Sequence, residues 1–162
     1  MSDLLKNIIR FIIFILIQVF ILNKIPPLHR FITPYLYFLY ILWLPFKIPR
    51  LSLSLLGFIF GLTLDFFTGT PGLHAAACTL IAYLRPFLIT LLMPKETVEV
   101  SYAEPSVTSL GWMPYATYVL LLTFIHHAYL VILEWMQFGN IIYFLGKVLA
   151  TTGISLLLIS IT

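Results

Sequence analysis

The chain has 162 residues, of which 61% are hydrophobic and only 9% are charged, and its formal net charge is +3. A soluble domain of this length would carry about a quarter charged residues and under half apolar ones, so the composition excludes an ordinary water-soluble fold and indicates an integral membrane protein. The basic residues lie near the ends of apolar segments, which favours a role in membrane topology over nucleic-acid binding. The single cysteine, Cys78, permits no disulfide within the chain.

The apolar segments predict an all-α protein with about six membrane-spanning helices in one domain, since a bilayer core of about 30 Å needs roughly 20 apolar residues. In the first segment, Lys6 and Arg10 precede the apolar run 11–22, and no small-residue cleavage site follows this run, so we expect an uncleaved helix and not a secretory signal. The second segment is short and rich in tyrosine, and a re-entrant course is the alternative for it. The predicted spans are about 4–22, 31–46, 51–67, 73–93, 112–136 and 141–160, and a polar loop fills 94–111.

The lysines and arginines predict that the N-terminus lies in the cytoplasm. In a six-span topology the inner side would carry Lys6, Arg10, Lys47, Arg50 and Lys95, against Lys24 and Arg30 outside. An odd number of spans, as with a re-entrant second segment, would place the C-terminus outside.

Three residues of the third segment define a face of one helix. Gly57, Gly61 and Asp65 are spaced four residues apart, so they share this face. The two glycines would let another helix approach closely, which directs Asp65 towards protein and not towards lipid. Because a carboxylate within an apolar segment is costly unless it is paired or hydrated, Asp65 is a candidate site residue.

A tight turn at 69–72, which contains Pro71 and Gly72, separates Asp65 from His74. The two residues lie at similar depth on either side of this turn, so we expect their side chains to approach each other or to face a shared polar pocket. The alternative is that Asp65 caps backbone donors of the turn while His74 lies in the headgroup region.

Polar residues in the later segments suggest further contacts. Arg85 either extends towards the inner membrane surface or pairs with another helix. His127 and Glu134 share a face of the fifth segment, and Glu134 is predicted to form an ion pair with Lys147 of the sixth.

The sequence indicates no catalytic, metal or cofactor site. His126 and His127 are adjacent and point about 100° apart on a helix, so they cannot ligate one ion without other partners. The zinc motif HExxH, the CxxC motif and the Gly-x-Ser-x-Gly elbow do not occur in the sequence.

The stretches Gly61-Leu-Thr-Leu-Asp65, Gly69-Thr-Pro-Gly-Leu-His-Ala75 and Ile81-Ala-Tyr83 resemble the central motif of the MreD family. This family is the small membrane subunit of the bacterial rod shape-determining machinery, the elongasome. The close resemblance covers 57–85, and the length and number of spans agree over the whole chain. By position, the motif residues are Gly61, Asp65, Pro71, Gly72, His74 and Tyr83.

The resemblance implies a multi-pass protein of the bacterial inner membrane without enzymatic activity. Its fold would be similar to that of the substrate-binding components of energy-coupling vitamin transporters. It would act as a scaffold for peptidoglycan synthesis, bind MreC, and associate with RodA, a class B penicillin-binding transpeptidase and MreB. Candidate contact surfaces are the glycine face of 51–67, the aromatic surface of 31–46, and the loop 94–111, which could equally be a solvated loop.

The alternative function is a small-molecule-binding membrane subunit of a transporter. In it, Asp65, His74, Glu134 and Lys147 would line an outward pocket. Transporters usually have discontinuous helices near the bilayer midplane, whereas the Gly/Pro break of this chain falls at a membrane surface, which weighs against this function.

Overall fold

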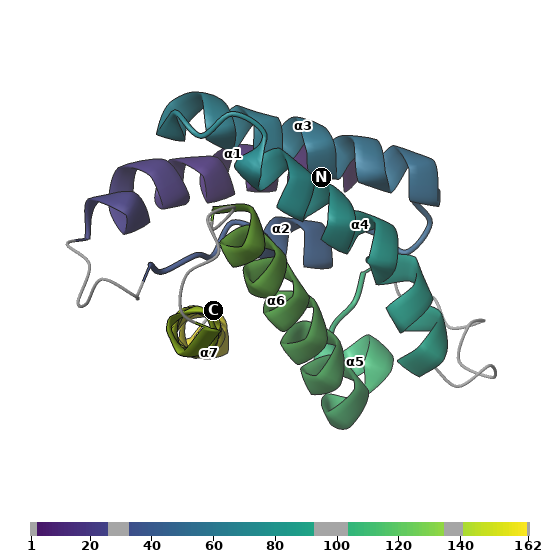
Figure 1. The fold of residues 1–162 in the computed structure, drawn as a ribbon. Helices are drawn as coiled ribbons and strands as arrows, with labels where there is room; N and C mark the ends of the chain where they lie inside the picture. The colour runs from purple at the N-terminus through teal and green to yellow at the C-terminus, as the bar shows by residue number, and fades with distance from the viewer. Residues whose placement is uncertain (1–2, 26–32, 93–103, 135–140, 162) are drawn as a thin grey trace.

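The structure is a computed structural model, and it describes residues 3–25, 33–92, 104–134 and 141–161 (Figure 1). All regular secondary structure in these ranges is helical. Five of the described helices are long and apolar enough to cross a membrane, which is compatible with a multi-pass membrane protein. They are Leu4–Lys24, Arg50–Thr68, Leu73–Leu92, Trp112–Glu134 and Ile141–Ile161. Parts of the predicted loops, including Lys95, Glu96, Glu99 and residues 137–140, lie outside the described residues.

The first of these helices changes its winding along its length. It begins as α1 (Asp3–Leu16), continues as a π-helical turn η1 (Ile17–Ile21) and ends as a 3₁₀ turn η2 (Leu22–Lys24). The π-helical turn holds Gln18, whose side chain is buried. Its amide donates to the Pro34 carbonyl at 3.1 Å and accepts from the Leu36 amide at 3.0 Å, so it bonds to the backbone of the following segment.

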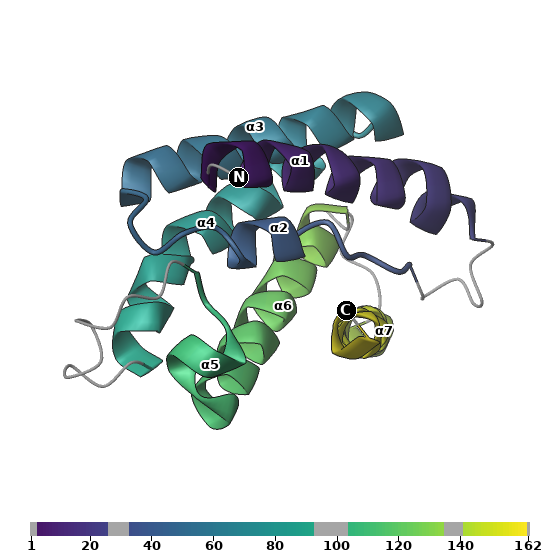
Figure 2. The ribbon, with the colours of Figure 1, turned by 180° about the vertical axis from the view of Figure 1, so that it is seen from behind.

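The segment after it differs from the predicted second span. Of its described part, 33–46, only α2 (Leu39–Leu42) is helical, so the spanning helix expected over 31–46 does not form there. The whole stretch from Tyr35 to Leu42 is nevertheless buried, and α2 lies in the middle of the molecule in both views (Figures 1 and 2). Irregular backbone at membrane depth is tolerated where protein covers it, which is the case here. The tyrosines expected to form a docking surface are therefore core residues instead.

The helices α3 (Arg50–Thr68) and α4 (Leu73–Leu92) form a close hairpin. A Cβ added to Gly57 would lie 2.9 Å from the Ala82 Cβ, and one added to Gly61 would lie 2.5 Å from the Ala75 Cα. The close helix approach predicted from the glycine spacing is thus present, but the helix that approaches is α4. The glycine face is internal, which corrects its assignment as a surface for MreC.

The remaining helices are α5 (Val107–Leu110), α6 (Trp112–Glu134) and α7 (Ile141–Ile161). Seen from either side, α1 and α3 run across the view, α4 and α6 run obliquely, and α7 is viewed end-on beside α6 (Figures 1 and 2). The long helices therefore do not share one axis. The apolar core lies where α1, α3, α4 and α6 surround the 35–44 segment.

The glycine packing yields a matched pair of substitutions. Gly61→Ala should lower the free energy of unfolding by about 1–3 kcal/mol, because its Cβ meets the α4 backbone and not a movable side-chain end. Gly153→Ala in α7, where an added Cβ meets nothing within 4 Å, should leave stability equal or slightly higher. Thermal unfolding in mild detergent measures both, and equal effects of the two changes would contradict the predicted contact.

Candidate functional site

Asp65 caps the start of α4. It is 2% exposed, and its two carboxylate oxygens accept from the amides of Gly72, His74 and Ala75 at 2.9–3.1 Å and from the Thr70 hydroxyl at 3.0 Å. The first amides of a helix have no partner within it, and an anion at that end is also favoured by the helix dipole. The capping alternative from the sequence is therefore the one that the structure contains.

The turn between α3 and α4 explains the glycines and the proline of the motif. Gly69 ends α3 with φ 69°, and Gly72 has φ 88°, a backbone region that favours glycine. The Leu73 amide donates to the Thr70 carbonyl at 3.2 Å, so Pro71 and Gly72 occupy the two central positions of a tight turn. The turn brings the α4 amides to the Asp65 carboxylate.

His74 does not direct its side chain to that carboxylate. It is 5% exposed, and its Nδ1 lies 2.8 Å from the Tyr37 hydroxyl inside the protein. Asp65 instead contacts the His74 backbone amide, so the hydrogen bond that joins these two residues is made by one side chain only.

A line of hydrogen bonds continues from Tyr37 into α6 and α7. The Tyr37 hydroxyl lies 2.9 Å from His126 Nε2, the Nδ1 atoms of His126 and His127 are 3.2 Å apart, and His127 Nε2 lies 2.9 Å from Ser155 Oγ. These four residues are fully buried.

The sequence analysis had proposed only His74 and His127 among these five residues. Tyr37 and Ser155 were missed, and His126 was considered only beside His127 as a metal or proton site, although the placement of three of the four histidines in apolar segments was an available signal. Within the described ranges, no three histidine, cysteine or acidic residues are grouped so that they could hold a metal ion.

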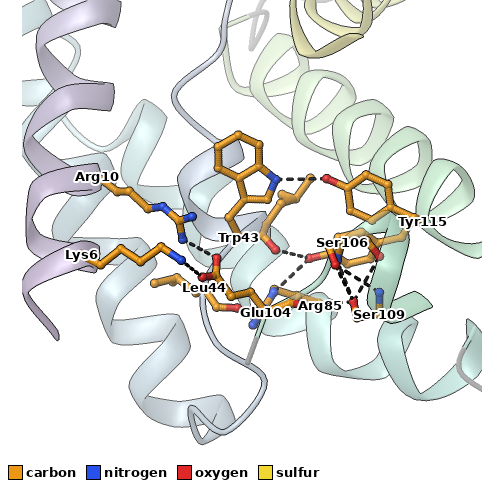
Figure 3. A network of polar contacts seen from close by, with 11 residues as sticks. Lys6, Arg10, Trp43, Leu44, Arg85, Glu104, Ser106, Ser109 and Tyr115 are labelled. Atoms are coloured by element: carbon orange, nitrogen blue, oxygen red, sulfur yellow. Dashed lines mark hydrogen bonds and ion pairs between the residues drawn. The ribbon is translucent and has the colours of Figure 1, made fainter. Parts of the chain in front are cut away.

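Arg85 pairs inside the bundle and does not extend to the surface. It is 1% exposed, its Nε donates to the Tyr118 hydroxyl at 3.0 Å, and its guanidinium also donates to the Leu44 carbonyl (Figure 3). The Tyr118 hydroxyl in turn donates to the Leu42 carbonyl at 2.9 Å. Arg85 and Tyr118 therefore donate to backbone carbonyls at and just after the end of α2. In a longer regular helix, backbone amides would donate to these carbonyls.

Glu104 connects the described end of the polar loop to α1. It forms ion pairs with Lys6 and Arg10 of α1 (Figure 3). Partial burial raises the pKa of Glu104, but hydrogen bonds and charge from these two cations outweigh that effect and place the pKa below its ordinary value of 4.5. This part of the 94–111 loop is thus engaged within the chain.

The predicted ion pair between Glu134 and Lys147 is present and links the end of α6 to α7. Because Asp65 binds backbone amides and these two charges bind each other, the charged groups assigned to an outward pocket have partners within the chain.

Tyr83 is an exposed member of the motif, with 53% of its surface accessible. The Arg50 guanidinium carbon lies 5.2 Å from the centre of its ring. Both residues border an open groove of about 730 Å³. The groove is lined by Arg50, Leu51, Ser54, Phe58, Ala76, Thr79, Leu80, Tyr83 and Tyr129.

A scan against protein-family models found no matching model, a search of curated proteins found no matching protein, and a search of solved structures found no matching structure. Function is therefore inferred from the residues of this chain.

Removal of the Asp65 cap should cause a large loss of stability. Asp65→Ala should lower the free energy of unfolding by about 2–4 kcal/mol, because it leaves buried amides of α4 without an acceptor. Asp65→Asn, which keeps one acceptor oxygen, should lower the free energy of unfolding by less. Thr63→Ala on the same helix should change it little. Detergent-based unfolding monitored by near-UV circular dichroism would test this order, and equal losses for all three variants would contradict it.

The Glu104 ion pairs predict a small pH dependence. Because its folded pKa is lowered, the stabilisation is complete above the ordinary value of 4.5 and is lost as pH falls through the folded pKa. The effect should be about 1 kcal/mol or less, since partly exposed pairs are screened by water. Melting temperatures between pH 3 and 6 (about 1.5 units to either side of the ordinary pKa) would show it, and Glu104→Gln should remove it.

Proposed function

We propose that this protein is a non-enzymatic membrane scaffold of the bacterial cell-elongation complex that binds MreC. The motif at 57–85 that resembles the MreD family supports the proposal, since its residues act together in one built unit, the capped α3–α4 hairpin. The proposal includes the inner-membrane location, the cytoplasmic N-terminus and the similarity to the substrate-binding components of vitamin transporters.

A scaffold role also agrees with how the buried polar side chains are used. Asp65 caps a helix, Arg85 and Gln18 bond to backbone, and Glu134 pairs with Lys147. The transporter-subunit alternative depended on several of these groups as ligand contacts, and their internal engagement makes it the less favoured function.

We place the partner from one observation, the groove beside Tyr83. Membrane helices associate through close packing at small residues and a few polar contacts, since hydrophobic burial adds little in lipid. Ser54, Ala76 and Thr79 supply small side chains in this groove, and Arg50 supplies a cation at its edge. We place the single membrane helix of MreC here. RodA, the class B penicillin-binding transpeptidase and MreB would join through that partner.

Retention of tagged MreC after co-expression and detergent solubilisation tests this proposal. Thr79→Leu should reduce the retained amount about tenfold, because the larger leucine side chain would occupy space in the groove that the partner helix needs. A tenfold reduction corresponds to a loss of about 1.4 kcal/mol of binding free energy. The matched control is Thr63→Leu on α3, outside the groove. Each threonine hydroxyl donates to the carbonyl four residues before it, at 2.7 Å for Thr79 and 2.8 Å for Thr63, so the two changes remove equivalent bonds.

Two outcomes would count against different parts of the proposal. If the unmodified protein retains no MreC, the scaffold function is wrong. If both variants retain MreC equally well, the partner binds elsewhere on the surface.

A further inference from the structure

The hydrogen-bonded line from His74 to Ser155 is continuous and joins four parts of the chain. It begins on α4 at His74, passes Tyr37 of the 33–38 segment, crosses α6 at His126 and His127, and ends on α7 at Ser155. Its four links measure 2.8, 2.9, 3.2 and 2.9 Å. Burying five polar side chains is costly unless they bond to one another, and all five do so here.

The donors and acceptors of this line can be ordered in two ways with every ring neutral. In the first order, His74 Nδ1–H donates to Tyr37, Tyr37 donates to His126 Nε2, His126 Nδ1–H donates to His127 Nδ1, and His127 Nε2–H donates to Ser155. In the second order every bond is reversed. Each neutral imidazole has one donor and one acceptor nitrogen, so both orders satisfy all four links.

We propose that this line is a proton relay between the start of α4 and helix α7. A proton binds His74 Nε2, the Nδ1 proton of His74 passes to the Tyr37 oxygen, and the Tyr37 proton passes to His126 Nε2. The Nδ1 proton of His126 then passes to His127 Nδ1, the Nε2 proton of His127 passes to Ser155, and Ser155 passes its own proton to a water molecule. One proton is taken up and one released, no ring stays charged, and the first order has become the second.

Both ends of the line have features that suit uptake and release. His74 is the one member of the line with measurable exposure, at 5%, and it lies next to the turn at the start of α4. At the other end, the buried hydroxyls of Thr123 and Thr152 have no hydrogen-bond partner within the described residues. Thr123 lies one turn from His127 on α6, and Thr152 lies one turn from Ser155 on α7, so their free hydroxyls can hold the water that takes the proton from Ser155.

The titratable neighbours of the line come from several elements. Asp65 of α3, Cys78 of α4, Tyr35 of the irregular segment and Glu134 of α6 all interact electrostatically with Tyr37. Asp65 and Glu134 also act on His74. The Asp65 carboxylate bonds to the His74 backbone amide, so an anion lies beside this end of the line.

Nitrogen NMR of ¹⁵N-histidine-labelled protein in lipid bilayers tests the ordering. Because one Nδ1 of the 3.2 Å pair must donate and the other accept, His126 and His127 should hold opposite tautomers in either order. Equal tautomers on the two rings would overturn the relay.

Exchange of the ring N–H protons with deuterated water tests the transfer itself. Tyr37→Phe removes the hydroxyl that links His74 to His126, so exchange at the His126 and His127 rings should slow about tenfold. Tyr40→Phe is the matched control, because Tyr40 lies in the same segment but outside the line, with its ring packed on Phe11 and Phe60.

The backbone amide of His127 serves as an internal reference for local opening in each sample. If the relay operates, the ratio of ring to amide exchange falls in Tyr37→Phe and is unchanged in Tyr40→Phe. If Tyr37→Phe merely loosens the fold, ring and amide exchange rise together and the ratio is unchanged, which would overturn the proposal.

Discussion

The fold depends on one carboxylate that holds the start of a helix. Asp65 is buried near the end of α3 and accepts hydrogen bonds from three amides of the following turn and helix. A buried anion without partners would be strongly destabilising in lipid, and free amides at a buried helix start would be costly as well. Each group satisfies the other. The contact fixes the direction in which α4 leaves the turn, and with it the position of His74.

A second constraint concerns the irregular segment between the first helix and α3. Its backbone cannot satisfy itself as a long helix would, so the surrounding helices supply the partners. Gln18 bonds at the beginning of this segment, and Arg85 and Tyr118 bond to carbonyls at its end. Its stretch from Tyr35 to Leu42 is buried by protein, which is the condition under which irregular backbone occurs at membrane depth. Its burial also places Tyr37 at the centre of the molecule, between histidines of two different helices.

These two constraints divide the roles of the polar residues. Most of those deep in the molecule either bond to backbone or belong to the line from His74 to Ser155, whereas the buried Thr123 and Thr152 hydroxyls have no hydrogen-bond partner within the described residues. At the edges, ion pairs connect Glu104 to α1 and Glu134 of α6 to α7. The groove beside Tyr83 remains open on the α3–α4 side. The proposed partner helix would lie in that groove, because its small side chains allow a helix to approach closely.

The sequence by itself determined the membrane class, the four long helices after residue 50, the close approach at Gly57 and Gly61, and the Glu134–Lys147 ion pair. These features follow from local quantities, namely the length of apolar runs, residue spacing along a helix and the depth of charges from a turn. Only the tertiary structure decided that α4 covers the glycine face, that 33–46 folds into the core, and that Arg85 bonds to Leu44. It also joined Tyr37, His126 and Ser155, which lie far apart in sequence. The reason is physical: a spacing pattern shows that a face will be covered, whereas the group that covers it depends on how helices distant along the chain pack together.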